Sequence, residues 1–483
     1  MARGIRSFFS VGHMVKPALV QGTLPTSRDA YNTLAKIAIP SVIEMVFMSI
    51  IGSVDMVMLR WMDDPTAAIA AVGLAGQPRM LTMSLFFALN IGVTAIVARR
   101  KGENRREDAN RALRNAILLI GALSILVLIA TLTWSRPLLL LAGAQEDTIE
   151  MSNTYFRILA YFTPISALTL CINAAQRGIG NTRTTMYVNL TSNIVNAVLN
   201  YLLIYGVTLN GATLIPAMGV AGDAWATGTG ICVGFVLCLI SIMHNKWGDS
   251  FLHLSFRDNW KLRKETVMPM LKIGGNAMVE QVAMRIGFFA YAAIVASLGT
   301  QAVAAHQVGM QFLSLSFTFG DGLAVAATSL VGQMLGQKRP DLATIYGKCA
   351  QRIALCSAFV LATIISLFRT PLVGIFLDGS IPANTESIAM AVNVLVIIGL
   401  FQPVQMSNVV ISGCLRGAGD NLHVALIMVL CVVLVRPGLS LLAVHGLHLG
   451  LLGAWSASLI DMSLRLVLMY KRFSSGKWQL KKV

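Results

Sequence analysis

Long apolar segments separated by short polar breaks dominate the chain. Ile117–Thr133, Val424–Val435 and Leu447–Met469 are examples. A helix of about 20 residues crosses the hydrocarbon core of a bilayer, so the chain has room for about twelve spans. No segment alternates apolar and polar residues as a barrel strand does, and a helix satisfies its own backbone polar groups in lipid. The pattern predicts an all-α integral membrane protein.

Composition agrees with that pattern. Hydrophobic residues make up 55% of the 483 positions and charged residues only 12%, against roughly 25% charged residues in soluble domains. This composition argues against a water-soluble fold. The formal net charge of +16 could indicate nucleic-acid binding. The distribution of the basic residues along the chain decides whether it does.

Basic residues are concentrated in alternate loops, and acids in the loops between them. The basic positions are Arg99, Arg100, Lys101, Arg105, Arg106, Arg111 and Arg114, then Lys246, Arg257, Lys261, Arg263 and Lys264, then Lys338 and Arg339, and finally Lys471, Arg472, Lys477, Lys481 and Lys482. The acidic loops contain Asp63 and Asp64, Glu146 and Asp147, and Asp378 to Glu386. Basic loops face the cytoplasm. We therefore expect both termini inside, an even number of spans in the plasma (inner) membrane, and no nucleic-acid partner.

The amino-terminal residues 1–30 contain no uninterrupted apolar core, so we expect a cytoplasmic tail and no cleavable signal peptide. The seven cysteines have no metal-ligand spacing and fall mostly in apolar spans, where we interpret them as small core residues. They are Cys171, Cys232, Cys238, Cys349, Cys356, Cys414 and Cys431.

The two halves of the chain repeat one another. Matched pairs at a nearly constant separation are Lys36 and Lys272, Glu44 and Glu280, Thr94 and Thr328, Gly102 and Gly336, Pro164 and Pro403, Arg177 and Arg416, Gly178 and Gly417, Gly219 and Gly450, and Gly222 and Gly453. Duplicated membrane folds usually build the transport path between the copies.

The repeat predicts two lobes of six helices around a central cleft, related by an axis along the membrane normal because each copy has an even number of spans. We expect a tail at 1–30, an N-lobe at 31–243 (helices 1–6), a cytoplasmic interlobe loop at 244–265, a C-lobe at 266–472 (helices 7–12) and a tail at 473–483. Such lobes can rock for alternating access, and a single chain is sufficient for it. Prolines either bend or end the spans at Pro40, Pro78, Pro164, Pro403 and Pro437.

Ionisable residues within spans are functional candidates, because burying them costs several kcal/mol unless they are paired or hydrated. Glu44 and Asp55 are eleven residues apart, which places them on nearly the same helix face, roughly 16 Å apart along the axis. The alternative is that Asp55 lies at the membrane boundary and Glu44 pairs with a buried cation.

Asparagines form a stripe at helical spacing in the fifth span. The positions are Asn189, Asn193, Asn196 and Asn200. Together with an aspartate, amide oxygens are hard ligands suited to sodium, and the same groups can set the proton affinity of a carboxylate. The competing interpretation is that the stripe only supplies hydrogen bonds between helices.

The second half has its own ionisable residues. Asp461 and Arg465 are one turn apart and are expected to form a structural pair. Arg285 is five residues from Glu280 and off its helix face, which leaves Glu280 freer to meet a substrate. His306 is interpreted as a packing residue rather than a proton carrier.

No nucleotide-binding loop, HExxH motif, nucleophile elbow or paired-cysteine metal site is present in the sequence. The chain is therefore interpreted as a secondary transporter, not an enzyme, and no cofactor is expected. Its energy must come from an ion gradient, or transport runs downhill.

Several stretches resemble the multidrug and toxic compound extrusion (MATE) family, and the likeness runs from about residue 31 to 472. They are Ser53-Val54-Asp55, Ala71 to Leu74, Gly92 to Gly102, Arg177 to Thr182, Asn196 to Gly206, Ser297 to Thr300, Ala304 to Gln307 and Cys414 to Asp420. The resemblance implies efflux of amphiphilic, often cationic, small organic substrates in exchange for sodium or protons.

The resemblance also implies site residues. Asp55 matches the cation-binding aspartate of the family's first helix, with Asn196, Asn200 and Thr227 completing the site, and sodium is possible at Asp55, Asn196 and Asn200. One branch has aspartate in place of Asn200, so a relay of two carboxylates is in doubt here.

A second cation site of the family is not matched in this chain. Another branch has a glutamate that aligns with Met284 and an aspartate that aligns with Gln405, so the site in that lobe is expected to be absent. Glu280, one turn before Met284, is a candidate to replace it or to bind a cationic substrate, and Glu44 is the corresponding candidate in the first half.

Two other functions stay open at this point. A flippase for lipid-linked sugars from the same superfamily would present several cations to a pyrophosphate, the candidates being Arg79, Arg285 and Arg436. A non-transporting membrane sensor would tolerate neutralisation of Asp55 or Glu280.

Overall fold

The computed structural model describes residues 7–60, 62, 65–146, 148–209, 212–243, 251–255, 257–377 and 384–481. By their internal contacts the residues form two compact units. The first-half unit is Ile43–Gly274, and the second-half unit combines the residues up to Val42 with Gly275–Val483. The predicted N-lobe contains the whole first span, whereas this division falls within it, between Val42 and Ile43. The predicted domain limits stay predictions.

Some residues named above lie outside the described ranges. They are Asp63, Asp64, Asp147, Lys246, Lys482 and residues 378–383, and within the predicted interlobe loop residues 244–250 and 256.

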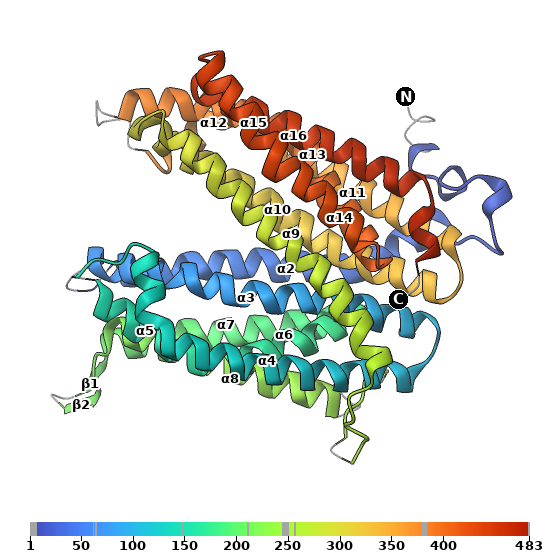
Figure 1. Ribbon diagram of the computed structural model, residues 1–483, viewed down its shortest axis with the longest axis horizontal. Coiled ribbons are helices and arrows are strands. Elements are labelled where there is room, and N and C mark those ends of the chain that lie inside the picture. Colours follow the sequence, from blue (N-terminus) through green and yellow to red (C-terminus); the bar gives the residue numbers. More distant parts are fainter. Residues whose placement is uncertain are drawn as a thin grey trace. The chain divides into compact units, whose positions relative to one another are not determined.

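The first half of the chain consists of long helices (Figure 1). They are α2 (Ser27–Leu59), α3 (Pro65–Gly102), α4 (Arg106–Leu141), α5 (Ile149–Tyr161), α6 (Thr163–Gly178), α7 (Thr182–Tyr205) and α8 (Gly219–Met243). A hairpin of β1 (Val207–Leu209) and β2 (Ala212–Ile215) joins α7 to α8, with Val207 opposite Ile215. This hairpin, which extends beyond the helix ends in Figure 1, was not predicted.

The second half repeats this order. Its helices are α9 (Lys264–Ala296), α10 (Thr300–Gly336), α11 (Pro340–Leu367), α12 (Arg369–Gly374), α13 (Thr385–Gly417), α14 (Asn421–Met428), η4 (Val429–Val435), α15 (Arg436–Leu441), η5 (Leu442–Gly446) and α16 (Gly450–Ser474). Short turns η1 (Val11–His13) and η2 (Pro17–Leu19) precede α2, and η6 (Lys477–Leu480) follows α16. The segment from α14 to η5 is one span in which two π-helical stretches flank α15.

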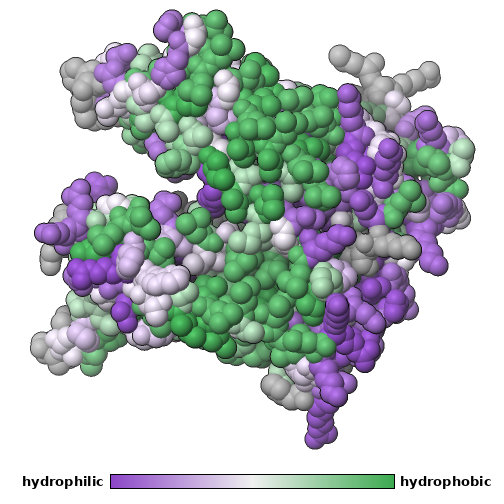
Figure 2. Space-filling view, in the orientation of Figure 1, coloured by the Kyte–Doolittle hydropathy of each residue, from purple (hydrophilic) through white to green (hydrophobic). Residues whose placement is uncertain are grey.

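The helices match the predicted number of spans. Among the described residues, ten helices are long and apolar enough to cross a membrane, and α5 with α6, bent by 51°, makes an eleventh. The twelfth is α7, whose 24 residues have sufficient length, while its asparagine stripe makes it less apolar. On the face drawn in Figure 2, apolar surface separates hydrophilic ends in each unit.

The prolines divide between the two expected roles. Pro40, Pro78 and Pro403 lie inside helices. Pro164 stands at the start of α6, where the helix axis bends, and Pro437 at the start of α15. Pro437 lies within the continuous span from α14 to η5, where its missing N–H removes a helical hydrogen bond between the two π-helical stretches.

The sequence repeat is also a repeat of contacts. The Thr94 hydroxyl on α3 donates to the Ala174 carbonyl on α6 (3.0 Å), and the matching Thr328 on α10 donates to Gly413 on α13 (2.8 Å). A Cβ built on Gly178 would lie 2.9 Å from the Thr94 carbonyl oxygen, and one on Gly417 would lie 2.2 Å from that of Thr328. Glycine is therefore required at both crossings.

Candidate functional site

Four of the predicted site residues form one hydrogen-bonded chain in the first-half unit. Asn200 Nδ2 donates to Asp55 Oδ1 (2.9 Å), and Asn196 Nδ2 lies 3.4 Å from Asn200 Oδ1 and 3.1 Å from Thr227 Oγ1. The chain links α2, α7 and α8, because the two asparagines are one turn apart on α7. Asn196 and Asn200 are buried, and Asp55 is partly exposed.

A second carboxylate stands beside this chain. Asp223 on α8 is buried and contacts the side chains of Asn200 and Tyr155. It interacts electrostatically with Asp55 and with Arg79 on α3. Position 200 supplies no second carboxylate, as the sequence shows, but α8 brings Asp223 close to Asp55.

Sequence reasoning missed Asp223 although a signal was present. It is the only acidic residue of α8, an otherwise apolar helix, and it lies one turn before Thr227. An ionisable residue within a span is a functional candidate by the same rule that singled out Asp55.

This arrangement suits a small cation. Two neighbouring carboxylates in a poorly hydrated site repel one another unless a proton or a metal cation compensates their charge. Asn200 turns its amide nitrogen toward Asp55. A sodium ion at Asp55 would need the amide oxygen there, which a rotation of the amide supplies, whereas a proton on the carboxylate needs no such change.

Glu44 forms a second set of side-chain contacts between α2 and α7. Its carboxylate accepts hydrogen bonds from Arg177, from Asn189 Nδ2 (2.5 Å) and from Thr185 Oγ1 (3.1 Å), and it is 0% exposed. Glu44 thus pairs with a cation, as in the alternative interpretation, although the Arg177 side chain is only partly buried, with 20% of its surface exposed. Asn193 Nδ2 donates within α7 to the Asn189 carbonyl (2.7 Å), whereas Asn189 joins α7 to Glu44 on α2.

Glu280 occupies the matching position in the second-half unit and has a cation partner from another helix. Its carboxylate accepts a hydrogen bond from Arg416 on α13 and is buried. Arg285 lies off its face, as expected, but Arg416 reaches it from another helix. The repeat therefore matches two ion pairs, not only two glutamates.

Met284 on α9 and Gln405 on α13 bring no carboxylate to the second-half unit. Gln405 is buried, and neither of its amide atoms has a hydrogen-bond partner. Throughout the described ranges no group of three His, Cys, Asp or Glu side chains could hold a metal ion.

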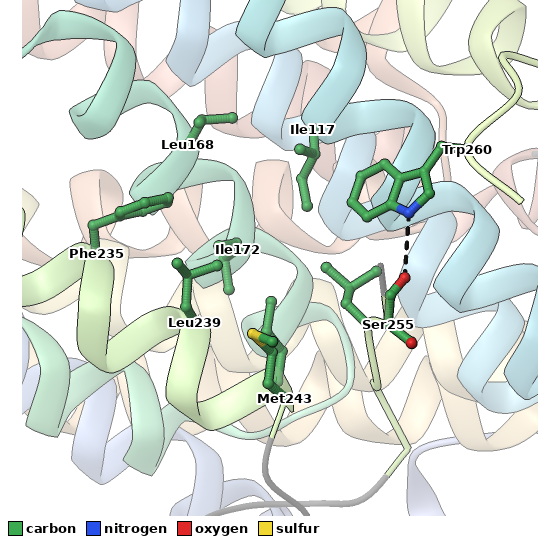
Figure 3. Close-up of a pocket in the computed structure, with 10 residues that line it drawn as sticks. Ile117, Leu168, Ile172, Phe235, Leu239, Met243, Ser255 and Trp260 are labelled. Carbon is green, nitrogen blue, oxygen red and sulfur yellow. Dashed lines mark hydrogen bonds between the residues drawn. The ribbon is translucent and has the colours of Figure 1, made fainter. Parts of the chain in front are cut away.

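An apolar cavity of about 250 Å³ lies elsewhere in the first-half unit (Figure 3). Leu168 and Ile172 of α6 and Phe235 of α8 line it, and Trp260 closes one side with its indole N–H bonded to the Ser255 carbonyl (3.2 Å). Its lining residues include no ionisable side chain, so it cannot bind the coupling cation.

The sequence profile of the MatE family matches residues 40–202 and 277–442. The chain therefore belongs to this family of MATE transporters and is a multi-pass membrane transporter rather than an enzyme. The two matched segments fall in the two halves of the repeat.

Curated relatives resemble the chain along nearly its full length. An uncharacterized transporter, YisQ of Bacillus subtilis, is 26% identical and covers 96% of this chain and 99% of its own. A probable multidrug resistance protein, NorM of Thermotoga maritima, is 29% identical with 93% of both chains covered. The multidrug resistance protein PmpM of Pseudomonas aeruginosa is 29% identical over 86% of this chain and 84% of its own.

Solved structures share the fold. A MATE protein crystallised in a bent conformation has a TM-score of 0.83 at 22% identity, covering 93% of this chain and 96% of its own. An outward-facing multidrug resistance MATE family transporter has a TM-score of 0.83 at 21% identity, with 93% and 97% covered. These likenesses confirm the predicted all-α membrane fold of twelve helices.

Proposed function

We propose that this chain is a cation-coupled antiporter that exports amphiphilic, often cationic, organic compounds by alternating access. The coupling ion, sodium or a proton, binds at Asp55 with Asn196, Asn200 and Thr227, and Asp223 supplies a second carboxylate. The observation that carries the proposal is the hydrogen-bonded chain from Asp55 to Thr227 with Asp223 beside it. The multidrug resistance names of two relatives support the substrate class.

Exchange requires that the ion and the substrate oppose one another's binding. A cation at Asp55 compensates one carboxylate and changes the bonds that join α2 to α7 and α8, so it favours one arrangement of these helices over another. A ligand shifts such an equilibrium only through its different affinity for the two states. We place the protein in the plasma membrane with both termini cytoplasmic, with one chain sufficient for transport.

Efflux from proteoliposomes tests the proposal. A fluorescent organic cation is loaded, a sodium or a proton gradient is imposed separately, and wild type is compared with Asp55→Asn. We expect one gradient to drive efflux in wild type and neither to do so in Asp55→Asn.

The matched control is Asp29→Asn. Asp29 lies on the same helix but accepts a hydrogen bond from Thr26 Oγ1 (2.6 Å) in the exposed first turn, so this variant should keep coupled efflux. Efflux driven equally well in Asp55→Asn would refute the assignment of the ion site.

The flippase alternative needs several cations free to meet a pyrophosphate. Of the three candidates, Arg436 is buried and hydrogen-bonded to Asp461, and Arg285 is exposed on α9. No observation favours this function over the antiporter.

A further inference from the structure

Two arginines and one aspartate form a buried cluster in the second-half unit. Arg436 Nε and Arg465 Nη2 both donate to the same oxygen, Asp461 Oδ2, over 2.9 and 2.8 Å. The residues come from α15 and α16 and are 2%, 4% and 0% exposed in that order. We name them the arginine cluster.

The arginine cluster carries one uncompensated positive charge. Asp461 neutralises one of the two guanidinium groups, and within the described parts of the chain no second carboxylate bonds to either. The other groups near Arg465 and Arg436 are the Cys431 thiol and the rings of Phe288 and Tyr291, which are neutral. Aromatic faces stabilise a guanidinium but do not cancel its charge, and an uncompensated buried charge costs several kcal/mol.

Buried polar atoms without partners lie on residues of the cluster and one turn away along α15. Arg465 Nε and the Ser440 hydroxyl, one turn after Arg436 on α15, are buried and have no hydrogen-bond partner. Asp461 Oδ1 also has none. Arg465 Nε is an unused donor on a cluster of net positive charge and so complements an anion, because anions accept hydrogen bonds and charge-assisted bonds are the stronger ones.

The backbone here is also unusual. Arg436 begins α15, which is flanked on both sides by π-helical stretches, η4 and η5. Such stretches are rare in helices and occur frequently at functional sites. The corresponding helix of the first half, α7, is a regular α-helix.

The cluster breaks the repeat of the two halves. At the separation that relates Gly219 to Gly450, Asp461 of α16 corresponds to Gly230 of α8. Arg465 corresponds in the same way to Gly234. The first half has a site rich in carboxylates near these positions, whereas the second half has added cations.

We propose that the arginine cluster binds a single negative charge, either a small free anion such as a halide or the carboxylate group of a zwitterionic substrate. Arg465 and Arg436 supply the charge, and Arg465 Nε and Ser440 supply donors. This site is separate from the proposed cation site and does not depend on it.

Thermal unfolding of the purified full-length protein tests the free-anion form. Sodium chloride or bromide is compared with sodium gluconate at equal ionic strength. A bound halide should raise the melting temperature saturably, by about 2 °C or more. In Arg465→Met the remaining pair of Arg436 and Asp461 is neutral, so the halide effect should disappear. Arg285→Met, which removes an exposed cation of the same unit, should keep it.

Ligand binding tests the substrate form. A fluorescent amphiphile that carries an amine and a carboxylate is compared with its methyl ester by anisotropy. Wild type should bind the zwitterion about tenfold more tightly or better, and Arg465→Met should lose this preference while Arg285→Met retains it.

The outcomes distinguish a free anion from a substrate carboxylate, and they also decide whether the arginine cluster binds a negative charge at all. A halide effect without a carboxylate preference identifies a free anion, and the reverse identifies the substrate. Absence of both in wild type, or their persistence in Arg465→Met, overturns the proposal. Should Arg465→Met not fold, Arg436→Met removes the other cation with the same expected losses. Neither readout uses an ion gradient or Asp55, so failure of the proposed coupling leaves this test unaffected.

Discussion

At the residue scale, the first-half site depends on two carboxylates of different exposure. Asp55 is partly exposed and accepts a hydrogen bond from Asn200, whereas Asp223 is buried among Asn200 and Tyr155. In the proposed site, Asp55 is the carboxylate that the surroundings can reach, and Asp223 is a second acid beside it. A cation bound between two acids is held more strongly than one bound by a single acid, since each charge attracts it.

Asp223→Asn is predicted to weaken the coupling-ion affinity by about tenfold or more, because it removes one of the two charges. The ion concentration that gives half-maximal efflux from proteoliposomes measures the change. Asp29→Asn, which neutralises an acid in the exposed first turn of α2, should leave this concentration unchanged. An unchanged value in Asp223→Asn would mean that Asp55 binds the ion without it.

At the element scale, matched ion pairs tie each first helix of the repeat to another helix of its own half. Glu44 on α2 pairs with Arg177 on α6, and Glu280 on α9 pairs with Arg416 on α13. Both glutamates are almost completely buried. Losing one partner leaves an uncompensated charge, which typically costs about 3–5 kcal/mol, whereas removing both costs far less.

A double-mutant cycle of wild type, Glu44→Gln, Arg177→Met and the double variant tests the first pair. Arg177→Met should strongly lower the melting temperature of the purified protein, and Glu44→Gln combined with Arg177→Met should recover most of the loss. Equal melting temperatures for the single and the double variant would show that the pair contributes little.

Close helix crossings give a second prediction at this scale. Gly178→Ala places a methyl group 2.9 Å from the Thr94 carbonyl oxygen, so it should force α6 away from α3 and lower the melting temperature. Gly73→Ala on α3, where a Cβ would meet nothing within 4 Å, is the control and should be neutral or slightly stabilising. Equal effects of the two substitutions would contradict the crossing.

Much of the fold could be predicted from the sequence, because apolar run length and the repeat specify spans directly. The site was predictable only in part. Helical spacing places Asn196 and Asn200 on one face, but it does not say which helix that face meets. For the same reason the partner of Glu280 was missed: Arg416 lies 136 positions away in the chain, and no local pattern connects them.

At the scale of the whole molecule, the distribution of charge predicts the direction of insertion. The loop containing Arg257 should face the cytoplasm and the loop containing Glu146 the opposite side. Cysteine placed at either exposed position can be labelled with a membrane-impermeant maleimide in intact cells and in inverted vesicles. Arg257→Cys should react only in inverted vesicles and Glu146→Cys only in intact cells, with the parent chain as background. The reverse pattern would contradict the predicted topology.

The central claim is that the cation bound at Asp55 opposes the binding of substrate. Linkage makes this directly measurable, because two ligands that oppose one another must change each other's affinity by the same factor. The measurement is the dissociation constant of a fluorescent organic cation for the purified protein at increasing sodium concentration and, separately, at decreasing pH. We predict that one of the two ions weakens substrate binding in wild type and has no effect in Asp55→Asn. Equal dependence in both proteins, or none in wild type, would contradict the claim.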